Sequence, residues 1–120
     1  MNNFKGNKYT ETQNLDIKEI AKLVRADLKQ FKDCKFSVSI ERYSMGQSLN
    51  VYIMQTPFDV YEYIEEERKY TLRANNLVTE VKNILNQYNY DNSDSMTDYF
   101  DTRFYSDIRF GKWNKAWTRL

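Results

Sequence analysis

The sequence has no histidine, one cysteine, three glycines and one proline among its 120 residues. Without histidine, the chain lacks the commonest general base and the commonest metal ligand. The single thiol of Cys34 cannot build a thiolate zinc site, and no histidine is available to activate it as a nucleophile. Three isolated glycines do not make a phosphate-binding loop of the Walker or dinucleotide type. These absences predict that the protein is not an enzyme and needs no cofactor or metal ion.

Long apolar runs are also missing. No run approaches the roughly 20 residues that span a bilayer, and the mean hydropathy is −0.82. The segment from Met1 to Thr10 carries lysines without an apolar stretch behind them, so no signal peptide is expected. A lone cysteine favours a reducing compartment. We therefore expect a protein of the host-cell cytoplasm, and the length of the chain suits one domain.

The first periodic segment predicts an amphipathic helix that follows a polar, flexible N-terminal arm, residues 1–13. Asp16 and Glu19 have the spacing of a capping box, which places the start of the helix at Asp16. Apolar side chains then recur every three or four residues and define one buried face: Ile17, Ile20, Ala21, Val24, Leu28 and Phe31.

After this helix the period of the pattern changes from about 3.6 to 2. Apolar and polar residues alternate over 36–40 and again over 49–54, with Gly46 in the segment between them. Two alternating runs joined by a short turn that contains glycine are typical of an antiparallel hairpin.

The C-terminal half predicts two helices, a loop and a third strand. Thr56-Pro57 has the pattern of a helix start, so a short helix is expected over 58–70, followed by a longer one from about Asn75 to Tyr88. Residues 89–101 are polar and acidic and predict a loop, whereas alternation over 104–110 predicts a strand. The expected fold is α+β in the order α-β-β-α-α-β, with a three-stranded antiparallel sheet, helices packed on one face, and residues 14–120 in a single domain.

Parts of the sequence resemble a known family. The segments are IAKLVRADLK (Ile20 to Lys29), KFSVSIERYSMGQSLNVYIM (Lys35 to Met54) with the following Thr56-Pro57, and Phe104-Tyr105-Ser106-Asp107-Ile108. Together they resemble a large polyvalent protein-associated domain family of phages and conjugative elements. The resemblance implies an origin in a mobile element. Its motifs are structural rather than catalytic, so it implies no site residues.

Charge is unevenly distributed, although the net charge is only +1. Residues 1–56 carry +3, residues 57–101 carry −6 and residues 102–120 carry +4. On the first predicted helix, five cations at i, i+4, i+7, i+11 and i+14 form a continuous basic ridge: Lys18, Lys22, Arg25, Lys29 and Lys32. The basic ridge can follow phosphates, contact an acidic protein surface, or be an ordinary solvated helix face.

A second candidate surface is the face of the sheet that the helices leave open. If the alternating apolar residues face the helices, this face presents tyrosines and basic residues: Lys35, Tyr43, Tyr52, Arg103, Tyr105 and Arg109. Such side chains can stack the bases of single-stranded nucleic acid, contact a protein, or pair across strands. Glu41 and Asp107 on the same face disfavour nucleic acid.

The tail and the acidic region give two further candidates. In the tail, Trp113 and Trp117 with the neighbouring Lys115 and Arg119 can form a basic aromatic anchor, or the two tryptophans can fold back to close the core. Trp113 is expected in the core, and both readings stay open for Trp117. The acidic loop at 91–101 lacks the glycine and the terminal glutamate of a calcium loop, so no metal site is expected there. Its carboxylates can be solvated or can imitate a row of phosphates.

The leading hypothesis is a small phage or mobile-element accessory protein that inhibits a host defence system stoichiometrically, in the manner of an anti-CRISPR protein. It would bind a defence effector protein or its nucleic-acid complex. The alternative is a nucleic-acid-binding module for DNA or RNA that uses the basic ridge, the sheet tyrosines and the tail. A structural or oligomer-forming protein comes third. The sequence leaves open the target, the oligomeric state, and whether the basic ridge or the 91–101 loop is the working surface.

Overall fold

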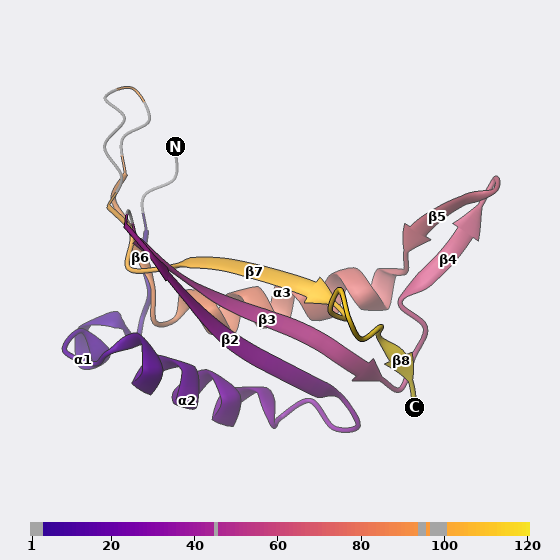
Figure 1. Ribbon diagram of the computed structural model, residues 1–120, viewed down its shortest axis with the longest axis horizontal. Coiled ribbons are helices and arrows are strands. Elements are labelled where there is room, and N and C mark those ends of the chain that lie inside the picture. The colour runs from indigo at the N-terminus through magenta and orange to yellow at the C-terminus, as the bar shows by residue number, and fades with distance from the viewer. Residues whose placement is uncertain (1–3, 45, 94–95, 97–100) are drawn as a thin grey trace.

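The computed structural model describes residues 4–44, 46–93, 96 and 101–120 (Figure 1). The helices are α1 (Tyr9–Thr12), α2 (Ile17–Leu28) and α3 (Leu72–Asn86). The strands are β1 (Phe4–Lys5), β2 (Lys35–Tyr43), β3 (Gly46–Thr56), β4 (Tyr61–Ile64), β5 (Glu67–Tyr70), β6 (Tyr90–Asp91), β7 (Tyr105–Phe110) and β8 (Thr118–Arg119). The α+β class expected from the sequence is confirmed.

The hairpin expected from the alternating pattern is present as β2 and β3. The two strands pair antiparallel, with Val38 opposite Val51 and Tyr43 opposite Gly46. The apolar positions of β3 are fully buried and lie in the core with the helices: Leu49, Val51 and Ile53. The alternation therefore predicted which side of the hairpin is covered.

The third strand of this sheet runs in an unexpected direction. β7 pairs with β3 in parallel, with Val51 opposite Ile108 and Ile53 opposite Phe110, and the sheet is mixed instead of antiparallel. The connection between the two strands explains the difference, because α3 carries the chain back along the sheet before β7 begins (Figure 1). The short strand β8 also pairs with β3 in parallel. β3 is thus the central strand.

The helices α2 and α3 lie on one face of this sheet (Figure 1). The face of α2 that was expected to be buried is buried, from Ile17 to Leu28, and the Asp16 carboxylate accepts a hydrogen bond from the Ile17 N–H at 2.7 Å. The core that the helices form with β3 also contains Phe104, whose side chain is fully buried. One face of the sheet is therefore covered by helices.

The short helix expected over 58–70 is wrong, because this segment forms the hairpin of β4 and β5. The rings of Tyr61 and Tyr70 stack across the hairpin at 5.4 Å. Glu65 and Glu66 form the turn and have φ angles of 54° and 69°. A two-residue type I′ turn needs a positive φ at both positions, as found here. The hairpin projects away from the sheet (Figure 1).

The two boundaries around this hairpin also differ from the expectation. Thr56 ends β3 instead of starting a helix, and its buried hydroxyl donates to the carbonyl of Phe58 at 2.6 Å. The following helix, α3, begins at Leu72 instead of near Asn75. Thr71 provides the N-cap, because its side-chain oxygen accepts from the Ala74 N–H at 3.1 Å.

Two segments expected to be irregular contain short strands. Residues 4–12, which we expected to belong to a flexible arm, form β1 and α1, and β1 pairs antiparallel with β6. The ring of Tyr9 lies 4.9 Å from that of Tyr90, so aromatic packing accompanies the strand pairing. In the expected 89–101 loop, residues 94, 95 and 97–100 lie outside the described residues, as do residues 1–3 of the arm. Among the helices that the structure describes, none has both the length and the apolar character needed to cross a membrane.

Replacing Thr71 with alanine is expected to lower the free energy of unfolding by about 1 kcal/mol, because the N-cap of α3 is lost. The hydroxyl of Thr71 also donates to the carbonyl of Asp59 at 2.8 Å, so the substitution loosens the base of the β4–β5 hairpin as well. Urea unfolding measures the change. Thr79→Ala, on the exposed side of the same helix, is the control and is expected to stay within about 0.5 kcal/mol of the original protein. Equal losses in the two variants would contradict the assigned cap.

Candidate binding surface on the open sheet face

The sheet face opposite α2 and α3 carries a groove of about 780 Å³. The strand pairing sets three rows of side chains across this face: Glu41–Ser48–Tyr105, Ser39–Asn50–Asp107 and Ser37–Tyr52–Arg109. These positions alternate along each strand with the apolar residues of the core. We call this surface the open-face groove.

Aromatic side chains stand at both ends of the open-face groove. At one end, the rings of Tyr43 and Tyr105 stack with their centroids 6.5 Å apart. At the other end, Tyr70 reaches the groove from β5, and its ring lies 5.4 Å from that of Phe110. Trp113 belongs to the same end and is 98% exposed. Exposed aromatic rings on a rigid sheet are well suited to bind a partner.

The base of the groove carries charges of both signs. The Nε atom of Arg109 donates to the Asp107 carboxylate at 2.6 Å, and the Nζ atom of Lys112 lies 5.4 Å from the centre of the Tyr52 ring. The amide of Asn50 donates to the Glu41 carboxylate at 3.5 Å. The two cations thus share the groove with two carboxylates, so its lining carries no net charge.

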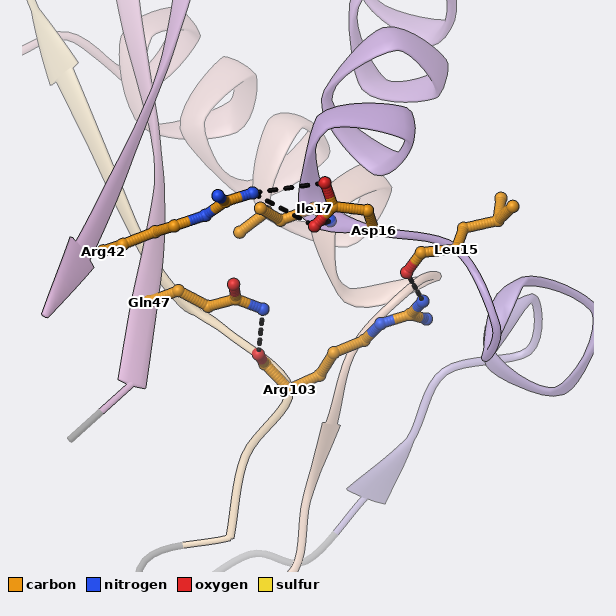
Figure 2. A network of polar contacts seen from close by, with 6 residues as sticks. All are labelled: Leu15, Asp16, Ile17, Arg42, Gln47 and Arg103. Carbon is orange, nitrogen blue, oxygen red and sulfur yellow. Dashed lines mark hydrogen bonds and ion pairs between the residues drawn. The ribbon is translucent and has the colours of Figure 1, made fainter. Parts of the chain in front are cut away.

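Four of the residues predicted for the open face lie on it: Tyr43, Tyr52, Tyr105 and Arg109. Lys35 is exposed at the beginning of β2, next to a register shift, and does not line the groove. Arg103 was also expected on this face, but its side chain turns toward the N-terminal segment (Figure 2).

Arg103 instead holds several backbone segments together. Its guanidinium donates to the carbonyl of Tyr88 at 2.9 Å and to that of Leu15 at 3.2 Å, and it also donates to the carbonyl of Thr12. Burial lowers the pKa of this guanidinium, with Tyr9 and Tyr90 opposing the shift. Hydrogen bonds from one arginine to carbonyls far away in the sequence leave no periodic pattern. The sequence alone therefore could not reveal this structural role of Arg103 and suggested a binding role instead.

A second set of polar contacts lies beside Arg103 (Figure 2). The side-chain amide of Gln47 donates to the carbonyl of Arg103 at 3.0 Å. The Asp16 carboxylate, which caps α2, also accepts from Arg42 at 3.1 and 3.2 Å. These contacts fix the start of α2 and the start of β7 relative to the β2–β3 hairpin.

The two tryptophans of the tail are placed differently from the expectation. The indole N–H of Trp117 donates to the Thr56 hydroxyl at 3.0 Å, and its ring lies 5.8 Å from that of Tyr61. Trp113 is exposed and not in the core. The turn explains the difference, because Gly111 has a φ of 78° and a Cβ atom there would lie 2.6 Å from the backbone nitrogen of Trp117. Lys115 is exposed on this turn, where its backbone forms an isolated antiparallel bridge with that of Lys112.

The basic ridge lies on the other side of the molecule. Lys18, Lys22, Arg25 and Lys29 are exposed along α2 and its C-cap, and Lys32 is exposed just beyond the helix. The guanidinium of Arg25 donates to the carbonyl of Val38 at 3.0 Å, which locates the ridge beside β2. Most of the residues predicted to bind therefore belong to two surfaces, the open-face groove and the basic ridge, which β2 separates, whereas Lys35, Arg103, Lys115 and Trp117 belong to neither.

No metal site emerges from the geometry of the described ranges. Among residues 4–44, 46–93, 96 and 101–120, no three His, Cys, Asp or Glu side chains lie close enough together to hold a metal ion. Burial, with a contribution from Asp33, raises the pKa of the Cys34 thiol and keeps it in its less reactive, protonated form.

Together, the fold and the groove define a small α+β domain with one open sheet face. The chain belongs to the large polyvalent protein associated domain 29 family, whose model matches residues 15–112. The match runs from just before α2 to the residues just after β7, so it includes the basic ridge and the open-face groove except for Trp113, and it excludes Lys115 and Trp117. It confirms the resemblance seen in the sequence. No curated protein and no solved structure matches the chain.

Substituting the two tryptophans one at a time tests the placement of the tail. Trp117→Phe is expected to lower the free energy of unfolding by about 1 kcal/mol, because it removes the hydrogen bond to Thr56. Trp113→Phe is expected to change it by less than about 0.5 kcal/mol, since the ring is exposed. Urea unfolding gives the energies. Iodide quenching of the tryptophan left in each variant should be strong for Trp113 and weak for Trp117, and the reverse order would contradict the placement.

Proposed function

We propose that this protein is a small accessory protein of a phage or mobile element that inhibits a host defence system by binding, in the manner of an anti-CRISPR protein. The open-face groove is its docking surface. The partner is a defence effector protein, alone or in its complex with nucleic acid. Inhibition is stoichiometric, because one bound chain blocks one effector.

The observation that supports this proposal is a groove of about 780 Å³ with aromatic rings at both ends. Tyrosine, tryptophan and arginine are the residue types most enriched at protein-binding hot spots, and Tyr105, Trp113 and Arg109 present all three here. Tyr52, Asp107 and Arg109 in the groove lie on paired strands. Little backbone freedom is therefore lost when a partner binds to them.

The balance of charge in the groove favours a protein surface over bare nucleic acid. Arg109 is already paired with Asp107, and Glu41 lies on the same face, so phosphates would meet carboxylates. A protein surface can present charges of both signs in a complementary arrangement. Membership of a family that occurs in phages and conjugative elements supports the proposed setting.

A nucleic-acid-binding module that combined the basic ridge, the sheet tyrosines and the tail would need one continuous surface. The ridge and the tyrosines lie on different sides of β2, so a nucleic acid would have to bend round the edge of the sheet to contact both. Trp117 is turned inward toward Thr56. Nucleic acid therefore remains an alternative for the basic ridge alone.

The proposal is tested by titrating the purified protein into a panel of guide-loaded CRISPR effector nucleases and measuring cleavage of target DNA. For a matching effector, cleavage should be lost at about one chain per effector. Two results would contradict the proposal. One is unchanged cleavage and no binding across the panel at equimolar and higher amounts, and the other is full inactivation by far less than one chain per effector.

A paired set of variants tests the docking surface. Tyr52→Ala combined with Arg109→Ala is expected to weaken binding to the effector at least about tenfold, which corresponds to about 1.4 kcal/mol. Lys82→Ala, an exposed cation on α3, is the control and should bind as the original protein does. Equal affinity of both variants for the effector would remove the open-face groove from the account.

A further inference from the structure

Strand β2 has an outer edge, on the side away from β3. β3 occupies one side of this nine-residue strand, and in the part of the chain that the structure describes no strand occupies the other side. The Val38 carbonyl points to that side, because it accepts from Arg25. The direction of the backbone groups alternates along a strand, so Phe36 and Ile40 also present their N–H and carbonyl groups outward. Exposed edges of this kind can pair with an additional strand.

A groove of about 440 Å³ runs between α2 and this edge. Its apolar lining comes from Leu28 on the helix and from Phe36 and Val38 on the strand, and Cys34 lies at the same groove. Phe36 and Val38 are only half-buried, in contrast to the fully buried apolar residues of β3. A strand added to β2 would direct every second side chain into this groove.

The charged side chains that line this groove are positive. Lys22, Arg25 and Lys29 of the basic ridge follow α2 beside β2, and Arg25 and Lys29 line the groove itself. The side chain of Arg25 also covers the outward carbonyl of Val38. This contact protects the edge against unspecific strand pairing, although no backbone hydrogen bond is formed there by Arg25. An incoming carboxylate could pair with Arg25 and so release this carbonyl for a backbone N–H donor.

We propose that the β2 edge binds an extended acidic polypeptide segment, which adds to the sheet as a strand beside the basic ridge. The backbone of the segment forms hydrogen bonds with the outward groups of Phe36, Val38 and Ile40. On its helix side, an apolar residue enters the groove and flanking carboxylates pair with Arg25 and Lys29. A nucleic acid has no regularly spaced N–H donors for the strand edge and would use the ridge alone. This surface lies apart from the open-face groove, so the inference does not depend on the function proposed for that groove.

The probe is a nine-residue peptide with blocked ends and the sequence ETETVTETE, which matches the length of β2 and presents glutamates around a central valine on one side. In NMR titrations of the original protein, the amides of Phe36, Val38 and Ile40 should shift and become protected from hydrogen exchange. The chain has one cysteine, so alkylation of Cys34 gives a second, independent signal. The rate of Cys34 alkylation should fall as the peptide covers the groove.

Two control peptides separate strand pairing from charge. KTKTVTKTK reverses the charges and should bind at least about tenfold more weakly. ETEPVPETE keeps the charges but disrupts the strand conformation and removes two backbone donors, so it should leave the amides of β2 unprotected. In the protein, Lys22→Glu combined with Lys29→Glu should weaken binding of ETETVTETE at least about tenfold. Lys82→Glu on α3 is the matched control and should leave binding unchanged.

Several results would overturn the inference. One is the absence of any shift or protection on β2 at about 1 mM peptide. Another is equal binding of the acidic and basic peptides, or equal protection of β2 by the proline-containing peptide. A third is a combination of two observations: a DNA or RNA oligonucleotide binds tightly through Lys22 and Lys29, and ETETVTETE leaves the amides of β2 unprotected. This combination would assign the basic ridge to nucleic acid. Because the peptide comparisons use the original protein, a variant that fails to fold cannot obscure the result.

Discussion

The pairing of β3 with strands on both sides determines the arrangement of the whole domain. β3 forms the hairpin with β2, accepts β7 in parallel on its other side, and pairs with β8 near its end. A parallel neighbour requires a crossover, and α3 provides it on the same face that α2 covers. The apolar positions of β3 are consequently buried under the helices. The opposite face stays open and carries the polar and aromatic positions.

Two small polar networks keep the remaining segments in register with this sheet. Arg103 donates to carbonyls of the segment around α1 and of Tyr88, just after α3, while Asp16 joins the start of α2 to Arg42 on β2. These contacts leave the open-face groove and the basic ridge on separate sides of β2. The two surfaces also differ in character: the groove balances its charges, whereas the ridge is positive and lies beside the edge of β2 that no described strand pairs with. Both surfaces lie largely within the family-matched region 15–112.

The sequence was most informative where burial is periodic. The amphipathic face of α2, the β2–β3 hairpin and strand β7 follow from the spacing of apolar residues, because one side of each element is covered. Periodicity carries no information on strand direction, so the parallel pairing of β7 could not be predicted. The β4–β5 hairpin was missed because Thr56-Pro57 matches a helix start, and a type I′ turn built from Glu65 and Glu66 has no glycine or asparagine to reveal it.

The placement of Trp113 and Trp117 depends on the turn after Gly111, which the spacing of residues does not describe. For the candidate sites, alternation located Tyr43, Tyr52, Tyr105 and Arg109 correctly on the open face, whereas Arg103 needed the tertiary structure.

Under the proposed function, the open sheet face is the surface that binds the partner. Hydroxyl-radical footprinting of the chain, free and bound to an effector that it inhibits, tests this claim directly. Tyr43, Tyr105 and Trp113 are exposed in the free chain and should lose reactivity in the complex. Leu15 and Leu23, exposed on the helix side, should keep theirs. Protection of Leu15 and Leu23 with unchanged reactivity of the three aromatic residues would rule out the open sheet face as the binding surface and assign binding to the helix side.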